Sequence, residues 1–200
     1  MIDPAEAARI EAALDEAQTK TRAPLVCVLA RASVSRDAEF LLGACILALT
    51  TPLPLLLFTA MSAQRIYVAQ LLVAILAAVL GAVPWVRRAL VPARAVRAAC
   101  HRAALAQFVL RGLDRSENGV LVYVSLAERY VRIVPADEAA AAVPHEHWQA
   151  FVDEALGPLA AGAIETALTG LAARCAARLA GPFPPTGPGA APQRQRFHTV

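Results

Sequence analysis

Charged residues are almost missing from one long stretch of this 200-residue chain. Between residues 40 and 85 there is no Asp, Glu or Lys, and Arg65 is the one basic residue. Two apolar runs, Phe40–Phe58 and Tyr67–Trp85, occupy the stretch, and each is close to the roughly 20 helical residues that cross a hydrocarbon core. Two such helices of a soluble domain would show more amphipathic pattern. The sequence therefore predicts a transmembrane helical hairpin over residues 40–86.

Several motifs that carry chemistry are also missing. No glycine-rich loop that could cradle a phosphate is present, and Ser125 lacks the context of a nucleophile elbow. The two histidines of His145-Glu146-His147 are two residues apart and would point to different sides of a helix. The four cysteines form no Cys-x-x-Cys pair and are expected to be small, reduced core residues: Cys27, Cys45, Cys100 and Cys175. The sequence therefore predicts no catalytic and no cofactor-binding residue.

The net charge of +3 hides an uneven distribution. Residues 86–115 carry seven arginines against Asp114 alone, whereas acidic groups outnumber basic ones in residues 1–39 and 116–200. Positive charge next to a span faces the cytoplasm, and the predicted membrane-surface residues are Arg87, Arg88, Arg94 and Arg97. We therefore expect a multi-pass protein of the inner membrane with both termini in the cytoplasm. A nucleic-acid patch is disfavoured because the cluster adjoins a span and lacks interleaved aromatic residues.

The flanks of the hairpin read as alternating helices and strands. Asp3, Pro4 and Glu6 are typical of a helix start with a capping box, and Leu25–Ala30 is an unbroken apolar run typical of a strand buried on both faces. Gly112 is placed to end a helix. The other predicted elements are a helix over Ala93–Arg111, strands over 119–125 and 129–134, a helix from Pro144 and a last helix through Ile164 and Leu179. Residues 181–200 are rich in Pro and Gly and are predicted to be a disordered tail.

These elements predict one discontinuous cytoplasmic α/β domain, made of residues 1–39 and 92–180. Leu25–Ala30 needs a sheet, and the strands after Gly119 can supply it. If Leu25–Ala30 pairs in parallel with Val120–Val124, the helix over 93–111 is the crossover between them. The transmembrane hairpin is then an insertion between the first strand and the crossover helix.

The segment Asn118–Val134 resembles the core of the TPM domain, also called TPM phosphatase. Its Gly, apolar strand, Ser-Leu-Ala-Glu-Arg turn and return strand follow one another as in that family. The lead-in over 108–116, Trp148 and Gly181–Pro185 are similar to its bacterial membrane branch. The resemblance implies a three-layer α/β/α sandwich. It also links the chain to phosphatase activity, metal binding and the assembly or repair of membrane complexes.

Asp137 and Glu138 are the candidate metal ligands, because the family often has an acidic loop where this chain has the Ala-rich stretch Pro135–Pro144. Calcium takes six to eight oxygen ligands, so a calcium or magnesium site would need others from elsewhere; the alternative is a solvated loop.

Two functions stay open. The favoured one is a non-catalytic interaction module on the lipid bilayer that binds other membrane proteins and no nucleic acid. The other is a membrane-tethered, metal-dependent phosphatase-like enzyme.

Overall fold

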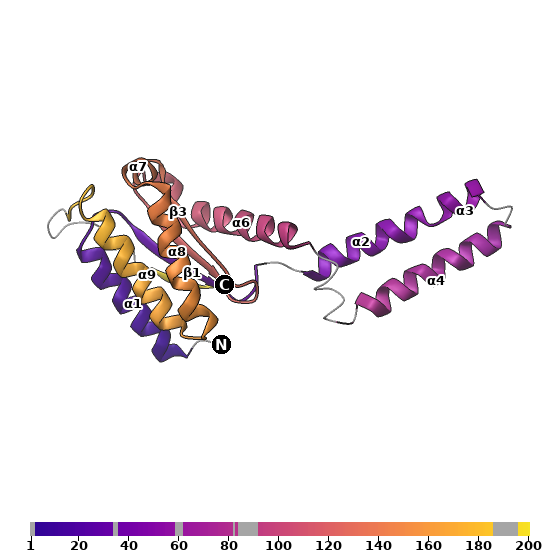
Figure 1. Ribbon diagram of the computed structural model, residues 1–200, viewed down its shortest axis with the longest axis horizontal. Helices are drawn as coiled ribbons and strands as arrows, with labels where there is room; N and C mark the ends of the chain where they lie inside the picture. Colours follow the sequence, from indigo (N-terminus) through magenta and orange to yellow (C-terminus); the bar gives the residue numbers. More distant parts are fainter. Residues whose placement is uncertain (1–2, 34–35, 59–61, 82, 84–91, 186–195) are drawn as a thin grey trace. The chain divides into compact units, whose positions relative to one another are not determined.

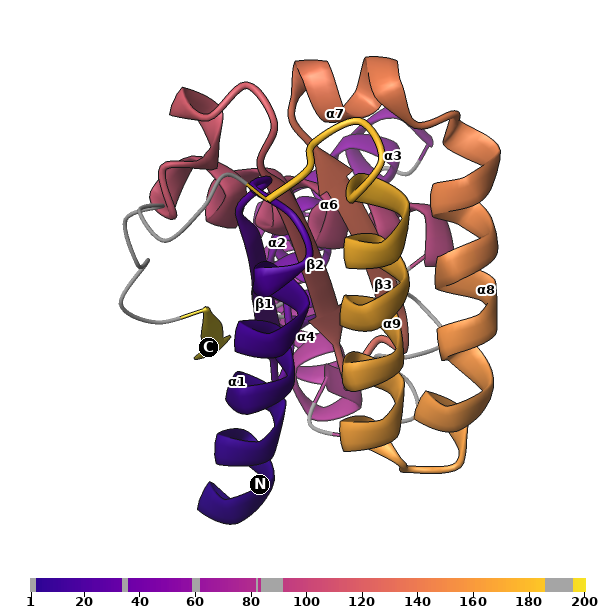
Figure 2. The same ribbon diagram turned by 90° about the vertical axis from the view of Figure 1, so that its left-hand side faces the viewer.

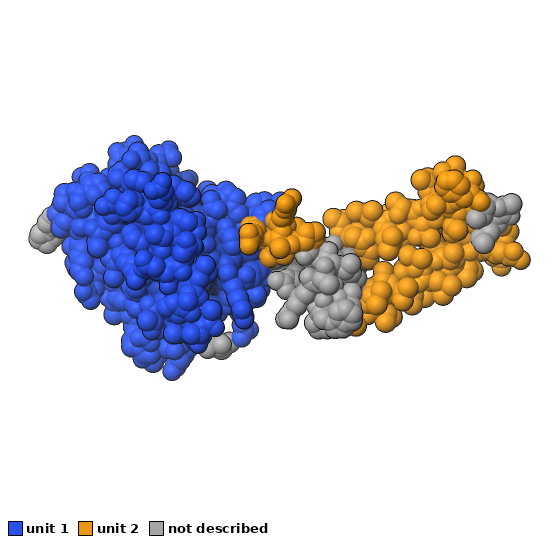
Figure 3. All heavy atoms as spheres, viewed as in Figure 1, with its two compact units in different colours: residues 1–33, 98–200 blue, residues 34–97 orange. Residues whose placement is uncertain are grey.

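The structure is a computed structural model that describes residues 3–33, 36–58, 62–81, 83, 92–185 and 196–200. The chain divides into two compact units (Figure 3). One unit contains residues 1–33 and 98–200, and the other contains residues 34–97.

The larger unit is built on a mixed sheet (Figure 1). The sheet has four strands in the order β3-β2-β1-β4. Strand β1 is parallel to both β2 and β4, and β2 pairs antiparallel with β3. The strands are β1 (Leu25–Ala30), β2 (Val120–Ser125), β3 (Tyr130–Pro135) and β4 (Phe197–Thr199). The predicted parallel pairing is confirmed in the register Leu25 with Val120 through Ala30 with Ser125.

Three helices pack on one face of this sheet, as Figure 2 shows. They are α1 (Pro4–Thr19), α8 (His145–Ala160) and α9 (Ile164–Leu179). Alternate residues of β1 and β2 contribute to this core, because successive strand side chains point to opposite faces. The other face carries Val26, Val28, Leu121 and Tyr123. They cluster with Ala104 of the crossover helix α6 (Ala93–Leu110) and with Leu113 of the short 3-10 helix Leu113–Arg115.

Local sequence signals set the ends of these elements as expected. The capping box of α1 is present, with Asp3 accepting from the Ala5 amide and Glu6 accepting from the Asp3 amide. Gly112, two residues beyond α6, has φ of 70°, a left-handed conformation that suits glycine. The Gln18 side chain accepts from the Leu25 amide at 3.0 Å and donates to two carbonyls of the α1–β1 connection. The first strand is thus fixed to the end of the first helix.

Two expectations about irregular segments are wrong. The Ala-rich stretch is not a loop, because Asp137–Ala142 forms helix α7. The tail over 181–200 is not disordered throughout. Phe197–Thr199 forms β4, Phe183 is buried, and the Phe183 carbonyl accepts hydrogen bonds from the Thr21 hydroxyl and the Arg22 amide. The buried rings of Phe183 and Phe197 thus lie near the two ends of the segment 181–200, whose Pro and Gly content predicts disorder.

The smaller unit consists of apolar helices. They are α2 (Arg36–Thr50), α3 (Pro52–Phe58) and α4 (Ala63–Gly81), and α2 packs against α4. Two segments of the described chain, Leu41–Phe58 and Ala63–Leu80, are long and apolar enough to cross a membrane. The side chains of Thr50 and Thr51 bond to carbonyls of the preceding turn, at Ile46 and Leu47. Polar groups in the first segment therefore have partners within the helix.

Candidate functional site

The carboxyl ends of β1 and β2 meet at one edge of the sheet. Ligands in open α/β sheets bind in a crevice at this edge. Here β1 is followed by Arg31 and Ser33, and β2 is followed by the turn Leu126–Arg129. Backbone bonds join the two segments, with the amides of Leu126 and Ala127 donating to the carbonyls of Ala30 and Arg31 at 3.0 and 3.1 Å. The β2–β3 turn is therefore held against the end of β1 and the residue that follows it.

Glu128 is the centre of a hydrogen-bond network at this edge. Its carboxylate accepts from the Ser125 hydroxyl and, at 3.0 Å, from the Ser33 amide. The Ser33 hydroxyl in turn lies 2.6 Å from the Tyr123 hydroxyl. Glu128 therefore connects the chain after β1 with the β2–β3 turn.

The same network argues against a nucleophilic role for Ser125. Its side chain is fully buried, and its hydroxyl donates to Glu128 rather than facing a substrate. Burial raises the pKa of Tyr123, against a smaller lowering by the hydrogen bond to Ser33. Tyr123 therefore stays protonated at neutral pH.

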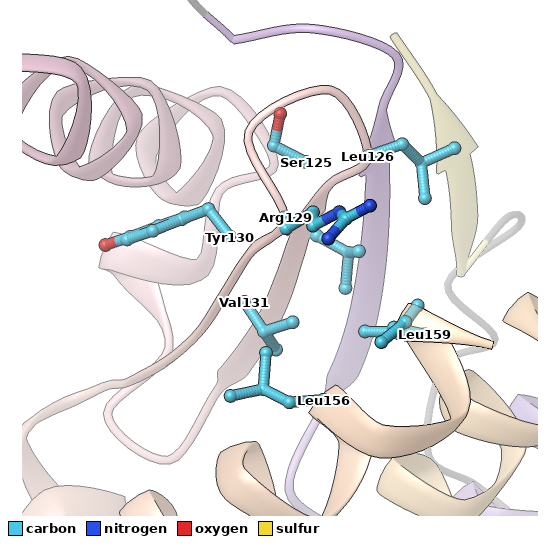
Figure 4. Close-up of a pocket in the computed structure, with 9 residues that line it drawn as sticks. Ser125, Leu126, Arg129, Tyr130, Val131, Leu156 and Leu159 are labelled. Atoms are coloured by element: carbon cyan, nitrogen blue, oxygen red, sulfur yellow. The ribbon is translucent and has the colours of Figure 1, made fainter. Parts of the chain in front are cut away.

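An apolar cavity of about 160 Å³ opens beside the turn (Figure 4). An engineered apolar cavity of about this size, near 150 Å³, binds benzene. Strand and turn residues form one wall and the end of α8 forms the other: Val124, Ser125, Leu126, Arg129, Tyr130, Val131, Leu156, Leu159 and Ala160. Leu156 of α8 is 38% exposed and lines the cavity. The cavity has room for one small apolar group.

Arg129 places a positive charge at this cavity. Its backbone φ is 49°, an uncommon left-handed conformation for a residue other than Gly, Asn or Asp, and its amide donates to the Leu126 carbonyl at 3.2 Å. Figure 4 shows its side chain on the same side of the turn as Leu159. The Glu128 carboxylate is hydrogen-bonded to Ser33 and Ser125, and among the described residues none that lines the cavity is acidic. The arrangement fits an apolar group that carries a neighbouring carboxylate.

A second cavity adjoins the first through Leu126. It has a volume of about 350 Å³ and lies at the ends of β1 and β4. Its lining is Pro4, Ala7, Leu29, Arg31, Leu126, Thr199 and Val200. The carboxyl edge of the sheet thus offers two neighbouring hollows, each with one arginine.

The predicted metal ligands lie elsewhere. Asp137 and Glu138 are exposed in the first turn of α7, and the Glu138 amide donates to the Glu117 carbonyl at 2.8 Å. Among the described residues, no group of three or more His, Cys, Asp or Glu side chains could hold a metal ion. The structure thus brings no third side chain of these types to the acidic pair, and its metal role stays a prediction.

The predicted membrane-surface arginines are only partly described. Arg94 and Arg97 are exposed residues of α6, while Arg87 and Arg88 lie outside the described residues.

The cysteines give no sign of thiolate chemistry. Cys27, Cys100 and Cys175 are buried, and burial raises the pKa of Cys175 to about 12 and that of Cys27 further. Cys45 is exposed on α2 rather than part of a core, so that expectation is wrong for this residue.

Sequence reasoning found the turn but not the cavity. The cavity depends on how the end of α8 packs across the β2–β3 turn, and no local pattern reports that distance. The sequence holds one signal for the unusual geometry of the turn. A short turn that closes an antiparallel pair needs a residue in the left-handed conformation, and this chain has Arg129 rather than Gly or Asn at that position.

Comparisons with known proteins bear on the fold. No model of a protein family matches the chain, and no curated protein matches it. Among solved structures it is similar to the NMR structure of the BA42 protein from the psychrophilic bacterium Bizionia argentinensis, with a TM-score of 0.59 and 12% sequence identity. The match covers 100% of this chain and 96% of that one. At this identity the similarity shows the fold alone.

Proposed function

We propose that the protein is a non-catalytic interaction module anchored in a membrane by the hairpin over residues 40–86. The observation that carries the proposal is the apolar surface of α2–α4. Leu42, Leu49, Leu57 and Leu72 are each more than 60% exposed, and the described chain provides nothing to cover them. Apolar surface of this extent marks a membrane or protein contact, and both segments have the length of a span.

The remaining parts of the proposal follow from the order of elements and the charges. The α/β unit is proposed to be a three-layer α/β/α sandwich, with α6 as the layer opposite α1, α8 and α9. The arginines that follow the second span favour cytoplasmic termini in a bacterial inner membrane. A relationship to the TPM domain remains a proposal, and the sequence of the β2–β3 segment supports it.

We place the binding of a partner at the cavity beside Arg129. A partner segment with an apolar side chain next to an acidic one would fill the cavity and pair with the guanidinium, and a charged pair shielded from water adds specificity. The hydrogen bonds of Glu128 hold the turn in place before binding, which lowers the entropic cost of association.

A photocrosslinking residue at Leu156 tests this placement in the intact membrane. We expect a specific adduct with another membrane protein, and we expect Arg129→Glu in the same chain to abolish it. Ala173, which is exposed on α9, is the control position and should give no such adduct. An adduct of equal yield at both positions, or one insensitive to Arg129→Glu, would contradict the site.

The topology is tested at Ser62, in the connection between the two candidate spans. In a chain with Cys45→Ala and Ser62→Cys, a membrane-impermeant maleimide should label Cys at this position from the periplasmic side of intact cells. The three buried cysteines are shielded from the reagent in the folded chain. Labelling that requires permeabilisation would show that the connection faces the cytoplasm.

The phosphatase alternative has a direct test at the acidic pair. We expect the purified protein to show no metal-dependent hydrolysis of a phosphomonoester, because Asp137 and Glu138 lack further side-chain ligands in the described chain and phosphoryl transfer needs positioned charge stabilisation. Assays with and without calcium, magnesium or manganese decide this point. Turnover that disappears in the Asp137→Asn, Glu138→Gln double variant would establish the enzyme.

A further inference from the structure

Helix α6 has an inner and an outer side of different composition. Cys100 and Ala104 on the inner side are completely buried. Positions spaced by three or four residues share one side of a helix, and the outer stripe defined in this way is Arg94, Ala98, Arg102, Leu105 and Val109, all exposed. Leu105 is 42% and Val109 58% exposed, so the outer stripe combines arginines with large apolar side chains.

The charge on α6 has one sign. Residues 93–110 contain three arginines and no acidic residue. No ion pair joins the guanidinium groups of Arg94, Arg97 and Arg102 to another described residue. Burial, and to a lesser degree the charge of Arg132 on β3, lower the pKa of His101, so His101 adds no positive charge at neutral pH.

The pattern fits a lipid surface better than water or a second copy of the chain. A helix that lies in the membrane interface has arginine or lysine on its polar side and large apolar residues that enter the headgroup region. A two-fold contact between copies would bring the arginines of one stripe to those of the other, and like charges repel. The chain position also agrees, because α6 begins at Ala93, twelve residues after Gly81 at the end of α4.

We infer that the outer stripe of α6 lies against the headgroups of an anionic bilayer, with Leu105 and Val109 inserted between them. The inference rests on the proposed membrane anchor and deepens it. The hairpin holds the chain in the membrane, and the stripe holds the α/β unit on its surface through an electrostatic contact that depends on lipid charge. Salt weakens contacts of this kind.

The experiment uses the full chain in vesicles of phosphatidylcholine with or without phosphatidylglycerol. A polarity-sensitive fluorophore is attached at Val109→Cys in a Cys45→Ala background, with Ala173→Cys as the matched control and Leu105→Cys as a second stripe position. With phosphatidylglycerol, we expect blue-shifted emission and quenching by headgroup spin-labelled lipid at positions 105 and 109 but not at 173. Replacing Arg94 and Arg102 by Gln should weaken the contact of α6 with lipid. The ratio of chains whose α6 contacts the headgroups to chains whose α6 does not should fall about 30-fold.

The outcomes separate this inference from the anchor itself. If the chain resists alkaline extraction but emission and quenching at 109 match those at 173, the inference is wrong and the anchor stands. A blue shift without lipid quenching would indicate a protein neighbour and would also overturn the lipid contact. Extraction of the chain by alkaline carbonate would contradict the proposed function and the inference with it.

Discussion

A fragment that begins at Ala93 is expected not to fold. It lacks β1, which lies between β2 and β4 in the sheet and whose six residues are between 0 and 4% exposed. It also lacks α1, which packs on α9 and supplies Ile10 and Leu14 to the core. Burying a large aliphatic side chain contributes about 1.5–3 kcal/mol, so the lost residues amount to roughly 10 kcal/mol or more. A typical domain is stable by about 5–15 kcal/mol in total.

The matched control keeps all strands and removes the smaller unit. Residues 1–33 joined to 98–200 through a flexible Gly/Ser linker should give a soluble protein that unfolds cooperatively in urea. The fragment from Ala93 should instead aggregate or give no cooperative transition by circular dichroism. A monomeric, cooperatively folded fragment would show that β1 is dispensable and that the discontinuous domain is wrongly drawn.

Elements with a strong local pattern were predictable. The apolar run Leu25–Ala30 indicates a strand buried on both sides, and it is one of the two inner strands of the described sheet. Asp3, Pro4 and Glu6 marked the start of α1 because their side chains satisfy local backbone groups. In both cases the information lies within a few neighbouring residues, so sequence reasoning could reach it.

Features that depend on distant packing were not predictable. Strand β4 has three residues, too few for a period to show, and it forms because Phe197 is buried against β1 and the carboxylate of Glu11 on α1 accepts from its amide. The cavity at Leu156 arises between a helix end and a turn that lie far apart in the chain. The role of Glu128 depends on Ser33, which is 95 residues away. Such contacts exist in the folded molecule and have no signature in a local window.

An arginine at the middle of each candidate span is expected to release the chain from the membrane. Leu49 and Leu72 lie near the middle of Leu41–Phe58 and Ala63–Leu80 and are 72 and 61% exposed. Arginine at the centre of a span costs about 2.5–3.5 kcal/mol on the insertion scale, where leucine is slightly favourable. The variant Leu49→Arg, Leu72→Arg therefore loses roughly 6–8 kcal/mol of insertion free energy.

The measurement is the fraction of chain that remains in the membrane pellet after alkaline extraction. The double variant should move to the supernatant or be degraded, while the unchanged chain stays in the pellet. Leu41→Arg with Leu80→Arg is the matched control, because both positions lie at span ends, where a long cationic side chain reaches the headgroups at little cost. For a hairpin that instead packs against a soluble partner, the cost of an arginine would not depend on whether it lies at the centre or the end of a helix. Equal extraction of the central and the terminal variants would therefore contradict a membrane-spanning hairpin, whereas retention of the terminal variant alone is what a bilayer requires.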